Sequence, residues 1–176
     1  EWQNTISGFS TDQVVDLKST SDGGFILLAS STSGIGADKT EGTHGSDDAW
    51  IVKLTSTGII EWQNDIGGLS SDSPQIIVQT SDGGYIVGMS SLSGLTGDKT
   101  VVNYGGRDYW IIKLNADGTI QWQKDFGGAM DELLVGVVET TDGGYIIAGT
   151  SSSDISALKS EESLISDIWL IKINAL

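Results

Sequence analysis

The sequence predicts an all-β protein built from three four-stranded antiparallel repeats, and the main evidence is a segment that is written three times. The copies begin at Glu1, Glu61 and Gln121. Each contains Trp-Gln, then Asp-Gly-Gly-[Phe/Tyr], then Asp-x-Trp-x-x-Lys-[Leu/Ile]. A fixed period indicates that one structural unit was copied and that the copies bury surface against each other. We therefore expect one domain over 1–176, with repeats 1–60, 61–120 and 121–176.

Each copy reads as four strands joined in a meander. In the first copy, Ser21-Asp22-Gly23-Gly24 stands between two β-rich runs, which is a strong hairpin signal. A Gly/Ser/Asp-rich loop at 33–48 then precedes the third strand, and a turn at 56–58 precedes the fourth. The strands expected in this copy are 14–20, 25–30, 50–54 and 60–66. The third copy lacks one residue in the variable stretch 159–167, as expected of a surface loop on a fixed scaffold.

The faces of these strands distinguish between all-β architectures. In the third strand Trp50, Val52 and Leu54 point to one side, and Ile51 points to the other. Both faces are largely apolar, so both must be covered, which is typical of β-propeller blades that pack on two neighbours around an axis. A β-trefoil is the alternative, because it also has three four-stranded repeats.

The composition excludes some classes of partner and chemistry. Twenty-four acidic and nine basic residues give a net charge of -15, which repels phosphate backbones, so we expect no nucleic-acid partner. The absence of cysteine excludes disulfides and thiolate nucleophiles. No apolar run is long enough for a membrane span.

The combination of Asp-Gly-Gly-Tyr, Asp-x-Trp-x-x-Lys-[Leu/Ile] and Trp-Gln-Lys resembles the tandem repeats of large secreted proteins of Bacteroidetes and archaea, which are related to the delta-60 class of β-propeller repeats. The resemblance covers the whole chain. It implies an extracellular or cell-surface propeller module, and it brings no catalytic residues with it.

The first and last predicted strands suggest how a ring could close. The chain opens with a fourth-type strand at 2–6 and finishes with a third-type strand at 169–173, which are neighbours within a repeat. Propellers typically have four to eight blades, so three are too few. We expect either a homodimeric six-bladed ring or further blades from a longer array.

Candidate binding residues are few. A lone histidine excludes a repeated catalytic triad and a multi-histidine metal site. Polar and aromatic groups assigned to the variable loops are candidate ligand contacts: His44, Tyr104, Arg107 and Tyr109. Carboxylates beside Gly-rich turns are candidate calcium ligands, since calcium prefers oxygen donors: Asp38, Asp48, Asp98 and Asp108.

The six tryptophans recur in fixed columns, which favours a role in packing between blades over sugar stacking. They are Trp2, Trp62, Trp122, Trp50, Trp110 and Trp169. We expect a non-enzymatic structural or adhesive scaffold with no cofactor other than the candidate calcium. The alternative is a lectin-like propeller that binds carbohydrate in its loops or between blades, and a glycan or a surface protein would be the partner.

Overall fold

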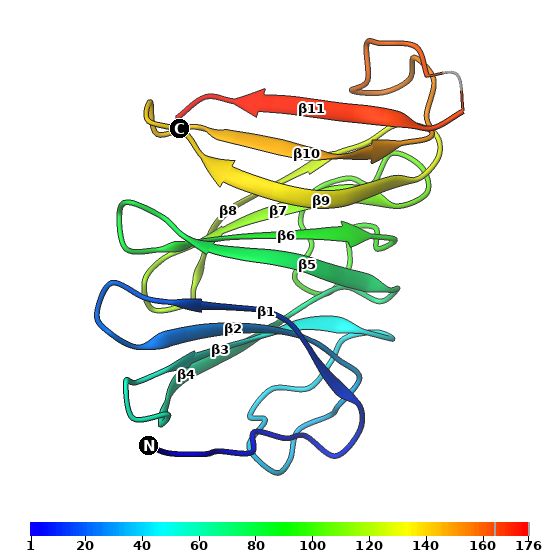
Figure 1. The fold of residues 1–176 in the computed structure, drawn as a ribbon. Coiled ribbons are helices and arrows are strands. Elements are labelled where there is room, and N and C mark those ends of the chain that lie inside the picture. Colours follow the sequence, from blue (N-terminus) through cyan, green and yellow to red (C-terminus); the bar gives the residue numbers. More distant parts are fainter. Residues whose placement is uncertain (164, 176) are drawn as a thin grey trace.

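The computed structural model describes residues 1–163 and 165–175. These residues form an all-β structure without helices, in three antiparallel sheets of four, four and three strands (Figure 1). The first sheet contains β1 (Asp12–Ser19), β2 (Phe25–Ser31), β3 (Asp48–Leu54) and β4 (Ile60–Ile66). The second contains β5 (Asp72–Gln79), β6 (Tyr85–Ser91), β7 (Asp108–Leu114) and β8 (Ile120–Phe126). The third contains β9 (Glu132–Glu139), β10 (Tyr145–Ser151) and β11 (Asp167–Ile173).

Each sheet is a meander of consecutive strands, and the three sheets are stacked face to face in chain order (Figure 1). The first strands contact one another through the stack, β1 with β5 and β5 with β9. Strands pair only within their own sheet among the described residues. This confirms the all-β class and the antiparallel repeats. It also disfavours the β-trefoil, whose barrel requires pairing between repeats. The three sheets do not close into a ring.

The expectation of four strands in every repeat is wrong for the third sheet, which has three. The strand expected at 2–6 is not formed either, since residues 1–8 belong to no strand. The reason is the same in both places. A fourth strand needs a third strand beside it, and the chain places residues 1–8 and β11 at opposite ends of the stack (Figure 1).

The predicted hairpin turns form as the sequence indicates. Gly23 has a φ of 83°, a left-handed conformation that favours glycine. The Asp22 carboxylate accepts a hydrogen bond from the Gly24 N–H at 2.9 Å. Asp82 and Asp142 make the same bond to Gly84 and Gly144. The repeated Asp-Gly-Gly sequence thus fixes the register of β1 with β2 and of its two counterparts.

The core lies between the sheets. One cluster joins Ile26, Leu28 and Ile51 of the first sheet to Val87 and Trp110 of the second. A second cluster joins the opposite face of the second sheet to the third, through Ile86, Tyr109 and Ile111 on one side and Val137 and Ile147 on the other. The middle sheet is therefore covered on both faces, as its apolar composition predicts.

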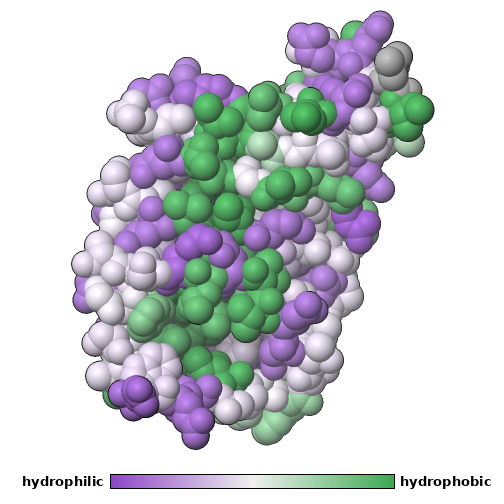
Figure 2. Space-filling view, viewed as in Figure 1, coloured by the Kyte–Doolittle hydropathy of each residue, from purple (hydrophilic) through white to green (hydrophobic). Residues whose placement is uncertain are grey.

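Apolar side chains also gather on the surface formed by the first strand of each sheet (Figure 2). Exposed members include Val14 and Leu17 of β1 and Leu133, Val135 and Val138 of β9. Exposed apolar patches of this kind, on β1 and β9, are typical of interaction surfaces. Within the described part of the chain no helix is of the length and apolarity needed to cross a membrane.

Candidate functional site

A lysine of the loop between β2 and β3 is buried against the first sheet together with its partners. The Lys39 ammonium donates hydrogen bonds to Ser31 Oγ at 2.8 Å and Ser33 O at 3.0 Å, and it forms an ion pair with Asp65 of β4. It lies 5.4 Å from the centroid of the Trp50 ring, within reach of a cation–π interaction. We call Lys39, Asp65 and Trp50 the first lysine cluster.

The same cluster recurs in the second sheet. Lys99 donates to Ser91 Oγ at 3.0 Å, pairs with Asp125 of β8, and lies 5.2 Å from the centroid of Trp110. We call Lys99, Asp125 and Trp110 the second lysine cluster. In both clusters the tryptophan Nε1 donates to a glutamine of the fourth strand, Gln63 or Gln123. These contacts join the tryptophan of the third strand to the Trp-Gln segment of the fourth. We call each lysine cluster together with its glutamine a lock.

The third sheet has the lysine and the tryptophan but lacks the aspartate and the glutamine of the lock. Lys159 is only 4% exposed, and its ammonium donates to Ser153 O. No carboxylate forms an ion pair with it among residues 1–163 and 165–175. The aspartate and glutamine of the other clusters come from β4 and β8, and the third sheet has no such strand. A buried ammonium without a counter-charge is costly.

Each complete lock contains a second carboxyl group. Asp48 lies at the start of β3 opposite β4, is fully buried, and accepts the His44 N–H. Burial raises the pKa of Asp65 to about 7, against the opposing effect of Lys39, and burial also raises the pKa of Asp48. Asp65, which pairs with Lys39, and the neighbouring Asp48 thus retain a proton to higher pH than a free aspartate does.

The second lock has the same electrostatics. Burial raises the pKa of Asp125 to about 8 and also raises that of Asp108, the counterpart of Asp48. Asp108 accepts the Tyr104 N–H, as Asp48 accepts the His44 N–H. In both complete locks, the aspartate two residues before the strand tryptophan therefore orders the preceding loop through a backbone hydrogen bond.

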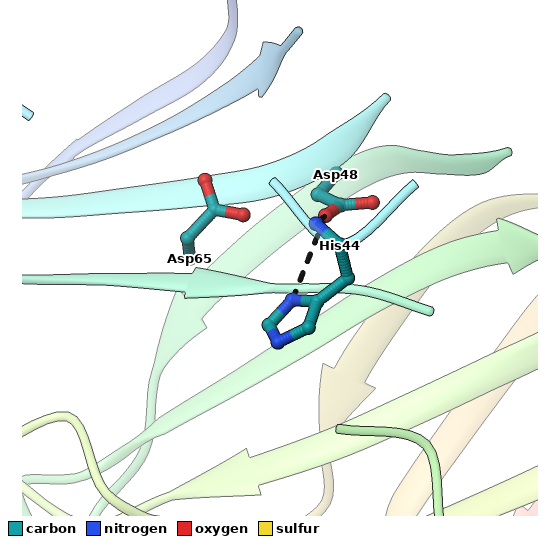
Figure 3. Close-up of side chains that lie close together, drawn as sticks. All are labelled: His44, Asp48 and Asp65. Carbon is teal, nitrogen blue, oxygen red and sulfur yellow. Dashed lines mark hydrogen bonds and ion pairs between the residues drawn. The ribbon is translucent and has the colours of Figure 1, made fainter. Parts of the chain in front are cut away.

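His44, Asp48 and Asp65 are the one group of three side chains in the described chain with candidate metal-ligand atoms close together, all within 4.8 Å. Figure 3 shows the two aspartates on neighbouring strands and His44 approaching from the loop. His44 Nδ1 lies 3.8 Å from Asp48 Oδ2 and 3.5 Å from Asp98 Oδ2. The Oδ1 atoms of Asp48 and Asp65 are buried without a hydrogen-bond partner.

These residues fit calcium poorly. Calcium takes six to eight oxygen ligands, whereas this group offers two carboxylates and an imidazole nitrogen. The Lys39 ammonium already lies against Asp65. Two other predicted calcium ligands hold the backbone instead, since Asp38 accepts the Ser7 N–H at 3.0 Å and Asp98 accepts the Gly67 N–H at 3.2 Å. Asp48 of the first repeat and Asp98 of the second both approach His44. Asp38 is the counterpart of Asp98 in the first repeat, and Asp108 is the counterpart of Asp48 in the second.

The four predicted ligand contacts do not form one group. His44 faces Asp48 and Asp98, and Tyr104 lines an open groove of about 460 Å³ with Val101, Val102 and Phe126. Arg107 is half-buried. Its N–H donates to Asp131 Oδ1 at 2.8 Å, and its carbonyl oxygen accepts from the Glu132 N–H at 2.6 Å.

Tyr109 differs from the expectation that it lies on a loop. It belongs to β7, is fully buried, donates its hydroxyl to Thr150 O at 3.0 Å and packs on Trp169. The third strand begins at Asp108 rather than at Trp110, which moves Tyr109 from the loop into the core.

Two similar clefts open between the sheets, and the sequence interpretation missed them. One cleft, of about 340 Å³, is lined by Asp22, Lys53, Glu61 and Trp62 of the first sheet and by Gln79 and Tyr85 of the second. The other, of about 410 Å³, is lined by Asp82, Lys113, Gln121 and Trp122 of the second sheet and by Glu139 and Tyr145 of the third.

These inter-sheet clefts match position by position. In each, a lysine pairs with the turn aspartate, Lys53 with Asp22 at 2.8 Å and Lys113 with Asp82 at 2.9 Å. In each, a tryptophan packs edge to face on a tyrosine, with ring centroids 5.7 Å and 5.9 Å apart. The signal was present in the sequence, because every one of these groups lies in a repeated column, but only the stacking order brings columns of successive copies together.

The tryptophans fall into two sets. Trp50 and Trp110 are buried in the complete locks, and Trp169 is half-buried in the incomplete one. Trp62 and Trp122 pack between sheets, and Trp2 packs in the same way on Phe25, with ring centroids 6.1 Å apart, although half of its surface is exposed.

A scan against models of protein families gives no match for this chain, and a search of curated proteins gives no significant one.

Proposed function

We propose that the chain is a non-enzymatic, extracellular or cell-surface repeat module of propeller blades that serves as a structural or adhesive scaffold. One observation carries this proposal: the lysine clusters and the sheet-to-sheet packing repeat from copy to copy, while the loops outside them differ. Repetition of the interior with variation of the loops is typical of a scaffold that displays surfaces.

The propeller architecture is part of the proposal. It is supported by three stacked meander sheets whose first strands are in contact, since successive propeller blades are stacked in this way, and a complete ring needs more than three of them. Two copies of the chain, or further repeats of a longer array, would supply the rest. In such a ring the first strands β1, β5 and β9, with the apolar patches on β1 and β9, would face inward (Figure 2).

A glycan array tests the scaffold against its rival. The scaffold predicts that the labelled chain binds no glycan above background, and that hydrogen exchange is slowest at the amides of β6 and β7 in the doubly covered sheet. Reproducible binding to one class of glycan would contradict the scaffold as the main function.

Carbohydrate binding is the second candidate, and the two inter-sheet clefts favour it. Sites repeated on a lectin should resemble each other, and these clefts do so although the loops do not. Each combines carboxylate, amine and carbonyl groups with an aromatic pair, which is the chemistry that sugars bind. If this function holds, Asp82→Asn should weaken glycan binding at one cleft and leave the other intact. Asp154→Asn, on an exposed loop outside both clefts, is the control.

The proposal includes no cofactor. Millimolar calcium, the range of weak extracellular sites, should therefore leave the melting temperature unchanged relative to magnesium. A calcium-specific increase that Asp48→Asn abolishes would instead assign calcium to the group around His44.

A further inference from the structure

Each internal interface joins two different sheet faces. The faces of the first and second sheets that meet their successors carry Ile26, Ala49 and Ile51, or Ile86, Tyr109 and Ile111, and all six are fully buried. We call this the forward face. The opposite, backward face of the second sheet carries Tyr85, Val87, Trp110 and Ile112, and it receives the forward face of the first. The chain makes this forward-to-backward contact twice.

The outer sheets expose the same two faces. The forward face of the third sheet carries Ile146, Ile168 and Leu170 in the matching columns, and Ile168 is 79% exposed and Leu170 64% exposed. The backward face of the first sheet carries Phe25, Leu27, Val52 and Leu54, beside an apolar groove of about 240 Å³ lined in part by Trp2 and Ile6. Val52 and Leu54 are buried and Phe25 and Leu27 are half-buried, so this face is partly covered, while the forward face of the third sheet is open. The two outer faces of the stack thus correspond to the two halves of its own internal interface.

Residues 1–7 are held on the first sheet as β4 is held on the second. Asn4 Nδ2 donates to Gly58 O at 2.9 Å, and Asn64 Nδ2 donates to Gly118 O at 2.9 Å. Trp2 packs on Phe25 as Trp62 packs on Tyr85. Residues 1–7 therefore have the position of a fourth strand, but no third strand lies beside them in the described chain.

β11 has the complementary deficiency. β3 and β7, its counterparts, pair with β4 and β8, whereas β11 pairs only with β10 among the described residues. An open strand edge next to an exposed apolar face favours the addition of a strand.

We infer that a second copy of this chain fills both deficiencies, with its residues 1–7 paired antiparallel to β11 and its backward face covering the forward face of the third sheet. This inference rests on the proposed scaffold and names its partner. The contact is head to tail, so two copies close a ring of six sheets.

The register of the exchanged strand follows from β3 and β4, where Trp50 lies opposite Asp65 and Ile51 opposite Asn64. By the same offset, Trp169 lies opposite Thr5 of the second copy, and Leu170 lies opposite its Asn4. Gln3 then takes the role of Gln63, which accepts the Trp50 Nε1–H. Glu1 takes the role of Glu61, which accepts from Lys53 at 2.6 Å, with Lys172 as its partner.

One position departs from this match. Thr5 stands in the column of Asp65 and Asp125, so Lys159 receives a hydroxyl where Lys39 and Lys99 receive a carboxylate. Thr5→Asp should complete the third lysine cluster across the interface. We expect it to lower the dissociation constant of the dimer about tenfold or more, and we expect Lys159→Met to cancel that gain.

Light scattering on a sizing column tests the inference directly. The chain should elute with twice its mass of 18.5 kDa and dissociate on dilution. Leu170→Glu should raise the dissociation constant by about a hundredfold or more, because it places a charge in the apolar contact. Leu95→Glu is the matched control, since Leu95 lies on a loop with 63% exposure and should leave the mass unchanged.

Three results would overturn the inference: a monomer at every concentration, a dimer that resists Leu170→Glu, or a Thr5→Asp variant that does not associate more tightly. None of these results would bear on the glycan-binding test of the scaffold, so the two proposals fail separately. Circular dichroism of the Leu170→Glu variant checks that the monomer stays folded, as expected for a change at an exposed position.

Discussion

The second and third sheets have nearly the same sequence pattern and very different surroundings. Ile111 of the second sheet is fully buried, while its counterpart Leu170 is 64% exposed. Lys99 has the Asp125 carboxylate and the Trp110 ring, while Lys159 has one backbone oxygen. The difference shows that the repeat sequence is suited to packing against a following sheet as well as to forming its own sheet. The same residue types are buried and paired only where another sheet follows.

The largest expected effect comes from removing the lysine in the complete cluster. Lys99→Met leaves two buried carboxyl groups without their cation, and breaking such a pair costs about 3–5 kcal/mol. Lys159→Met should change the unfolding free energy of the monomer by less than about 1 kcal/mol, because no carboxylate depends on it. Urea denaturation of both variants at pH 8 measures the contrast. Equal losses would show that the two clusters do not differ as described.

The next effect concerns the apolar column of the same two sheets. Ile111→Ala removes a fully buried side chain, which costs about 2–5 kcal/mol. Leu170→Ala should cost the monomer about 0.5 kcal/mol or less, because that side chain lies mostly in water. Thermal unfolding under conditions that keep the chain monomeric compares them. A large loss at Leu170 in the monomer would mean that the forward face of the third sheet is already covered.

The last effect in this series is the pH dependence of the complete locks, which is spread over several pH units. The pKa values of Asp65 and Asp125 are raised by burial to about 7 and about 8, so the folded chain keeps protons that the unfolded chain releases above pH 4. The free energy of unfolding should therefore fall as the pH rises from about 4 to 8.

Two controls sharpen this pH prediction. Asp125→Asn should flatten the decline, because an amide has no proton to lose in this range. The turn aspartates act in the opposite direction at low pH. At Asp82 the effect of burial is outweighed by hydrogen bonds from Thr80, Lys113 and Gly84, which lower the pKa to about 2, so its contribution is lost below pH 4. A stability that rises steadily from pH 4 to 8 would contradict the assignment of the buried carboxyl pairs.

The repeated columns made much of the fold predictable. The Asp-Gly-Gly turns and the alternation in the third strand determine the hairpins and the two buried faces, since both are local patterns with a direct structural meaning. The number of strands in the third sheet was not predictable in this way. A local pattern at 2–6 has strand character, but a strand forms only where a partner edge lies beside it, and that depends on the stacking order.

The candidate site was predicted less well for a related reason. His44, Asp48 and Tyr104 were found from their loop context, but Lys39 and Lys99 were not, because a lysine in a polar loop gives no sign that it is buried. The sequence also did not show that Tyr109 lies in β7 rather than in the loop, because a shift of one or two residues in the predicted start of the strand changes that assignment. The inter-sheet clefts combine columns from successive copies, which no single copy reveals.

Cysteine cross-linking tests most directly the central claim, that the packing between sheets continues between copies. The chain has no native cysteine, so a pair can be introduced without background. Chains carrying Asn4→Cys mixed with chains carrying Leu170→Cys should form a disulfide-linked heterodimer under mild oxidation, because these positions lie opposite each other in the inferred register. The control mixture of Asn4→Cys and Leu95→Cys chains should not. Equal cross-linking in both mixtures, or none in either, would contradict the exchange of residues 1–7 onto β11.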